Sequence, residues 1–185
     1  MKSFLFMSIV FSGFFCLGTS VIHGGLMQRN EGYGLCSYKK ETVDFINVNG
    51  SASFDEIKVQ GKTIVNGSLY ADESAMNTLQ VNGRAQLKNC SISSEAVING
   101  ALLADNTNFG GELSVASQQI KLGGCSVASI RIREVASYTG TQVVELRSGT
   151  KVNGSITVES GKGEVWLFSN SQVIGEIIGA QVIEK

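Results

Sequence analysis

Short alternations of apolar and polar residues fill the chain after residue 42. They run for a few residues each, as in Leu79-Gln80-Val81 and Ile130-Arg131-Ile132, with Gly, Asn and Ser between them. Alternation with a period of two predicts β-strands. After residue 21 no segment carries the i, i+3, i+4, i+7 apolar pattern of an amphipathic helix over three turns. The pattern therefore predicts an all-β protein.

The alternations belong to a repeat with a period close to 17 residues. One column of aliphatic residues recurs at this interval and contains Val48, Val65, Val81, Ile98, Val115 and Ile132. Each of the first four precedes Asn-Gly. Val152-Asn153-Gly154 is a fifth such motif. Near the C-terminus the interval lengthens, because residues 149–156 match residues 170–177 at a shift of 21. A fixed interval of this size is typical of repeat architectures.

Two folds fit these short strands. Asn-Gly between alternating segments is a strong hairpin signal, so an antiparallel barrel or sandwich is one alternative. However, every Asn-Gly has the same column types before and after it, which favours identical positions in stacked coils. We therefore predict a single-stranded parallel β-helix with about 17–21 residues per coil and seven or eight coils over residues 43–185. Asn and Gly would both supply the positive φ of a recurrent bend.

The N-terminus carries the features of a secretory signal peptide. Lys2 is followed by an apolar run from Phe4 to Leu17 and then by small and polar residues. The run is shorter than the roughly 20 residues that span a bilayer. We predict a signal peptide over residues 1–20, an irregular leader or N-terminal cap over 21–42, and a β-helix over 43–185. The mature protein would have no stable membrane span and would be exported to the periplasm, the extracellular space or the cell surface.

Composition argues against several function classes. The net charge is −1, without the basic excess that nucleic-acid binding requires. With one histidine and no paired-cysteine spacing, the sequence predicts no catalytic triad, metal site or cofactor site. Asp72, Lys88 and Asp105 fall in one column, so we interpret them as a charge-alternating surface ladder. We expect a protein that is not an enzyme.

Three cysteines follow the signal peptide. Cys90 and Cys125 share a column but lie two coils apart, about 9–10 Å by strand spacing, which is too far for a disulfide. We predict that they are not paired with each other. Cys36 precedes the repeats, and we regard it as the candidate for an intermolecular bridge.

The repeat resembles that of bactofilin-like, polymer-forming bacterial proteins. The likeness lies in valine-x-glycine steps through about residues 46–178, including Val152-Asn153-Gly154-Ser155-Ile156 and Val173-Ile174-Gly175-Glu176-Ile177. It implies a parallel β-helix that associates end to end into filaments. Bactofilins are typically cytoplasmic and lack a signal peptide, so residues 1–20 depart from the pattern. The implied cytoskeletal role is therefore not carried over.

Two functions are compatible with these features. The first is an exported, non-catalytic structural protein of the bacterial envelope whose partner is itself. We place its self-association surface in the apolar C-terminal coil, with no appended cap, at Trp166, Phe168, Ile178 and Val182. The alternative is a secreted binding module or adhesin that uses one β-helix face to bind a glycan or a host surface. A β-helix polysaccharide hydrolase or lyase is a third alternative.

Overall fold

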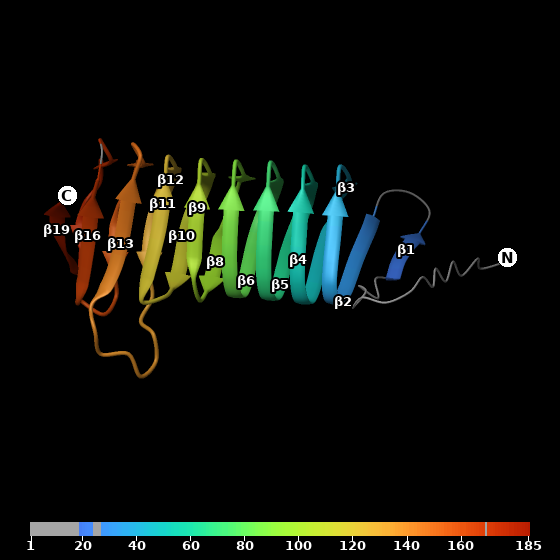
Figure 1. Ribbon diagram of the computed structural model, residues 1–185, viewed down its shortest axis with the longest axis horizontal. Coiled ribbons are helices and arrows are strands. Elements are labelled where there is room, and N and C mark those ends of the chain that lie inside the picture. Colours follow the sequence, from blue (N-terminus) through green and yellow to red (C-terminus); the bar gives the residue numbers. More distant parts are fainter. Residues whose placement is uncertain (1–18, 24–26, 169) are drawn as a thin grey trace, which may run out of the picture.

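The protein is a parallel β-solenoid. The computed structural model describes residues 19–23, 27–168 and 170–185, and in these ranges every regular element is a strand. The strands wind through about nine turns that lie side by side in chain order, from the N-terminal turn to the C-terminal turn (Figure 1). The predicted fold class is confirmed.

The strands differ in length because some of them continue around a corner of the solenoid. In chain order they are β1 (Thr19–His23), β2 (Met27–Lys39), β3 (Thr42–Val43), β4 (Phe45–Asp55), β5 (Lys58–Asp72), β6 (Ala75–Lys88), β7 (Ser91–Ile92), β8 (Ala96–Asn99), β9 (Leu102–Asp105), β10 (Asn108–Ala116), β11 (Gln119–Gly123), β12 (Ser126–Ile132), β13 (Gln142–Arg147), β14 (Lys151–Val152), β15 (Ile156–Val158), β16 (Gly163–Leu167), β17 (Gln172–Val173), β18 (Ile177–Ile178) and β19 (Ala180–Glu184).

Each complete turn contributes one strand segment to each of three faces. The first face contains β3, β7, β14 and β17, the second contains β8, β15 and β18, and the third contains β9, β11, β13, β16 and β19. The long strands β5 and β6 cross all three. Within a segment, alternate side chains point inward and are buried, so successive turns place apolar residues over one another in continuous columns.

The predicted aliphatic column is one of these inward columns on the second face. Val48, Val65, Val81, Ile98, Val115 and Ile132 are consecutive partners in the parallel pairing, and none is more than 2% exposed. Phe109 pairs with Ile92 and with Val127, as a second predicted column requires. The repeat interval therefore corresponds to one turn of the solenoid.

The Asn-Gly corner is tight because the glycines of successive turns lie against one another. Gly50, Gly67, Gly83 and Gly100 have φ between +139° and +146°, which side chains rarely allow. A Cβ on Gly67 would lie 2.0 Å from the carbonyl oxygen of Gly50. The preceding asparagines have no positive φ, so the expectation that both residues supply it is wrong.

The asparagines instead form a hydrogen-bonded ladder along this corner. Asn66 Nδ2 donates to Asn49 Oδ1 at 2.8 Å, and Asn82 and Asn99 each donate in the same way to the asparagine one turn earlier, at 2.6 Å. Arg133 then donates from Nη2 to Asn99 Oδ1. Asparagine recurs at this position because each amide bonds to the next.

A second corner, not predicted from the sequence, places non-glycine residues at positive φ. Lys40, Glu56, Glu73, Asn89 and Asn106 have φ between 46° and 53°. In three of these turns the next residue donates a hydrogen bond to the carbonyl that precedes the corner. The donors are Ser74 Oγ to Asp72 O (2.7 Å), Cys90 Sγ to Lys88 O (3.1 Å) and Thr107 Oγ1 to Asp105 O (3.0 Å).

Residues 27–42 differ from the predicted irregular leader. β2 pairs in parallel with β4 from Arg29↔Phe45 to Lys39↔Asp55, so it forms a further turn before residue 43. β1 pairs with β2 in the antiparallel direction, from Thr19↔Glu31 to His23↔Met27, and so covers part of the outer edge of β2. Apart from residues 19 and 20, the predicted signal peptide lies outside the described residues.

An insertion interrupts the regular interval before the last turns of the solenoid. Residues 133–141 leave the solenoid between β12 and β13 and form a loop that projects from the rod (Figure 1). After the loop, Val152 pairs with Val127 on the first face, so Asn153-Gly154 does not belong to the Asn-Gly corner of the second face. The predicted shift of 21 is confirmed by the pairs Val152↔Val173 and Ile156↔Ile177.

Candidate functional site at the C-terminal end

The last turn of the solenoid has one paired and one open edge on each face. β17 pairs with β14, β18 with β15 and β19 with β16. Among the described residues, no strand pairs with the opposite edge of β17, β18 or β19. Backbone N–H and C=O groups along these open edges are free to bond to another strand.

Apolar side chains lie inside this open edge. Val182 is the inward partner of Val165, which has no exposed surface, yet Val182 is 49% exposed. Val173 and Ile177 also continue inward columns and are only partly buried. Ile178 pairs with the outward residue Thr157 and is 50% exposed at the rim. The end therefore exposes the continuation of the core.

Trp166 and Phe168 do not contribute to this end surface. Trp166 follows the inward residue Val165 in β16 and is on the outer side of the third face, one turn before the end. Its indole Nε1 donates to Glu164 Oε2 at 2.7 Å, and Lys185 Nζ lies 4.7 Å from its ring. Of the four residues predicted at the association end, Val182 and Ile178 lie in the last turn, and association through them stays a prediction.

Phe168 shares the lateral position of Trp166. Their ring centroids lie 6.4 Å apart in an edge-to-face arrangement, and the guanidinium carbon of Arg147 is 4.1 Å from the Phe168 centroid. Because cations cover both rings, these contacts stabilise the side of the rod by cation–π attraction. They leave the open strand edges unaffected.

A buried carboxylate on the outer side of the third face was not predicted. Glu145 is only 2% exposed, because Arg147 pairs with it at 2.6 Å, Lys121 lies 3.7 Å away and Gln119 donates an amide hydrogen bond to it. Three donors around one carboxylate give a structural ion pair. Gln119 and Lys121 lie in β11 and Glu145 and Arg147 lie in β13. The loop of residues 133–141 separates these strands in the sequence, so the regular repeat interval does not align them.

The predicted charge ladder is confirmed. Asp72 pairs in register with Lys88 and Lys88 with Asp105, and the Lys88 Nζ to Asp72 Oδ2 distance is 3.8 Å. Lys39 and Asp55 extend the column with an ion pair of 2.7 Å. Among the described residues, no three His, Cys, Asp or Glu side chains are grouped to hold a metal ion.

Cys90 and Cys125 are buried and free, as predicted. Burial raises the pKa of both thiols, that of Cys125 to about 11. A protonated thiol is a poor nucleophile, so their role is packing and corner hydrogen bonding. Cys36 lies within the solenoid, in register with Ala52, and is only 3% exposed. Cys36 takes part in a disulfide, and an intermolecular bridge through it stays a prediction.

Comparisons with known proteins identify no relative. No family model, no curated protein and no solved structure matches the chain. Across the part of the chain that the structure describes, no helix is long and apolar enough to cross a membrane. Functional inference therefore rests on the solenoid and its surfaces.

Proposed function

We propose that this protein is an exported, non-catalytic structural protein of the bacterial envelope that associates with copies of itself through the C-terminal end of its solenoid. The observation that carries the proposal is the open last turn, where Val182 continues a core column and is nevertheless 49% exposed. The repeat's likeness to bactofilins supports end-to-end association, and the signal-peptide features of residues 1–20 support export to the envelope.

Association at this end would satisfy two kinds of group at once. A second chain would cover Val173, Ile177 and Val182, and burial of apolar surface contributes roughly 25 cal/mol per Å². It would also bond to the free backbone groups of β17, β18 and β19.

The two ends of the rod are not equivalent. At the N-terminal end, β1 already pairs with residues 27–31 of β2 in the antiparallel direction. If the C-terminal end of a second chain paired in parallel with β2, it would have to displace β1. Contact between two C-terminal ends needs no such displacement, so we expect it to form first.

Sedimentation velocity of the purified mature chain over a range of concentrations tests the proposal. We expect concentration-dependent association that is lost when Val182→Lys and Ile178→Glu are combined, because both charges would lie in the new interface. The matched control combines Leu103→Lys and Tyr33→Glu, which place the same charges on exposed apolar positions far from the end. A monomer at all concentrations would refute the proposal, and so would equal association of the end variant and the control.

Trp166→Ala tests whether association uses the open C-terminal end or the outer side of the third face. Because Trp166 lies on the side of the rod, its loss should leave association unchanged while it removes the contacts with Glu164 and Lys185. A loss of association in Trp166→Ala would instead place the interface on the third face.

A further inference from the structure

We propose that a shallow hollow on the third face, in the first four turns of the solenoid, binds an acidic oligosaccharide built from uronic-acid units. This site is independent of the self-association surface, which lies at the other end of the rod (Figure 1). The hollow has a volume of about 360 Å³. Four adjacent strand segments form it, and each of them points two side chains outward.

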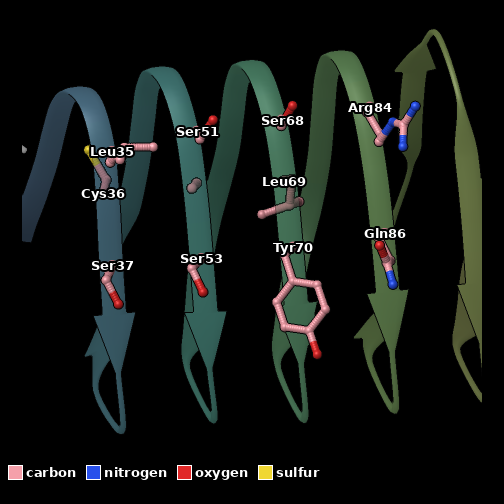
Figure 2. Close-up of a pocket in the computed structure, with 11 residues that line it drawn as sticks. Leu35, Cys36, Ser37, Ser51, Ser53, Ser68, Leu69, Tyr70, Arg84 and Gln86 are labelled. Atoms are coloured by element: carbon pink, nitrogen blue, oxygen red, sulfur yellow. The ribbon is translucent and has the colours of Figure 1, made fainter. Parts of the chain in front are cut away.

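The shape of the hollow follows from the sizes of these outward side chains. The two outward positions are occupied by Leu35 and Ser37 in β2, Ser51 and Ser53 in β4, Ser68 and Tyr70 in β5, and Arg84 and Gln86 in β6. Four serines therefore form a low floor, while the larger residues form its two ends. Figure 2 shows the two rows of side chains crossing the four strands. Strands 4.7–4.9 Å apart give the site a length of roughly 14 Å, which suits a short chain of sugars.

The floor and walls offer polar groups without partners in the protein. None of the side-chain hydrogen bonds of the described residues engages the hydroxyls of the four serines, the phenol of Tyr70 or the amide of Gln86. In the same strands, the charged column beside the hollow is paired, as in Lys39 with Asp55 and Lys88 with Asp72. The hollow therefore carries several closely spaced free hydroxyl groups, which are suited to a ligand that is itself rich in hydroxyls.

Two residues determine the chemistry of the ligand. Tyr70 is 43% exposed and presents an apolar ring edged by a hydroxyl, against which the C–H face of a pyranose can pack. Arg84 is exposed, and no carboxylate of the described residues pairs with it. Its guanidinium can bind a carboxylate through two parallel hydrogen bonds. A sugar chain that carries carboxylates matches both groups, whereas a neutral glycan would leave Arg84 without a partner.

Isothermal titration with tetramers of galacturonate and mannuronate tests the site. We expect binding of at least one tetramer, and much weaker binding of the same tetramer after methyl esterification, which removes its charge and keeps its rings. Arg84→Gln should weaken binding of the acid form by about tenfold or more. Tyr70→Ser should weaken both forms by roughly threefold to tenfold, and Ser53→Phe should abolish binding by filling the floor.

Matched variants control for charge and aromatic content. Arg131→Gln removes an exposed arginine of the second face, and Tyr33→Ser removes a tyrosine that is 61% exposed but does not line the hollow. Both should bind as the unaltered protein does. The Val182→Lys, Ile178→Glu protein should also bind equally, so failure of self-association and failure of the site are distinguishable. Absence of binding by both acid tetramers would overturn the proposal, as would equal binding by Arg84→Gln and Arg131→Gln.

Discussion

Val165 and Val182 occupy the same inward position in successive turns of the third face, and they differ in what covers them. Val165 is packed between the turns before and after it and has no exposed surface. Val182 packs on Val165 and is 49% exposed. The same residue type thus serves as core in one turn and as surface in the next.

This difference predicts unequal effects of the same substitution. Val165→Ala should lower the free energy of unfolding by about 2 kcal/mol, because it removes buried methyl groups and leaves a cavity. Val182→Ala in the monomer should cost less than about 1 kcal/mol, since half of the side chain is already exposed. Urea unfolding at low protein concentration measures both values. Equal losses would mean that a further layer covers Val182.

Ile98 and its neighbour Val97 test the inward column of the second face. Ile98 has no exposed surface, whereas Val97 points outward and is partly exposed. Ile98→Asp should prevent folding, because it places an unpaired charge between Val81 and Val115. Val97→Asp should fold and should lose little stability. Circular dichroism and thermal unfolding distinguish the two, and a well-folded Ile98→Asp protein would contradict the register.

Alanine substitutions at Gly67 and Gly149 distinguish the effect of a close contact on stability from that of backbone strain. In Gly67→Ala the new Cβ would lie 2.0 Å from the carbonyl of Gly50, so the turns would have to move apart. Gly149 has φ +73°, but no atom lies within 4 Å of a Cβ placed there. Gly149→Ala should therefore cost about 1 kcal/mol through strain alone. We expect a clearly larger loss in Gly67→Ala, measured by chemical denaturation, and equal losses would rule out contact between the glycines.

The buried thiol of Cys125 gives the protein a pH dependence in the alkaline range. Its pKa rises from 9.0 to about 11 on folding. Between these values the unfolded chain releases a proton that the native protein retains, so the free energy of unfolding falls as pH rises. A shift of this size corresponds to roughly 2–3 kcal/mol at about 1.4 kcal/mol per unit.

Cys125→Ser isolates this contribution from other groups that titrate at high pH. Serine does not ionise in this range and can still donate to the carbonyls of Ala104 and Gly123 that Cys125 Sγ contacts at 3.4 Å. Urea unfolding at pH 8 and pH 11 should show a smaller loss of stability for Cys125→Ser than for the unaltered protein. Parallel losses would show that the thiol ionises equally in both states.

The periodic parts of the fold were predictable because one inward position repeats one residue type. Val48 to Ile132 defined both the interval and the buried column. The turn formed by β2 was missed because Gly32-Tyr33-Gly34 pairs with Val48-Asn49-Gly50 and keeps only its last glycine. The 16-residue spacing of Gly34 and Gly50 was the available signal.

The candidate sites were less predictable than the columns. Val182 and Ile178 lie in the last turn, as their position in the sequence indicates, whereas Trp166 and Phe168 lie on the side of the preceding turn. They lie on the side of the rod because Val165 points inward. The columns found in the sequence do not reach Val165, so they do not show this direction. The hollow can be predicted only when outward residues one turn apart are compared with one another. One such row contains Leu35, Ser51, Ser68 and Arg84.

The loop of residues 133–141 shows that the pairing of successive turns does not fix the number of residues between two strands of one turn. β12 and β13 pair with their neighbours on either side although nine residues intervene between Ile132 and Gln142. Sequence can therefore be added at this corner while the columns remain in register. A small fluorescent domain inserted between Ser137 and Tyr138 would project from the side of the rod, away from the C-terminal end and the hollow, and would allow the protein to be located in the envelope of living cells.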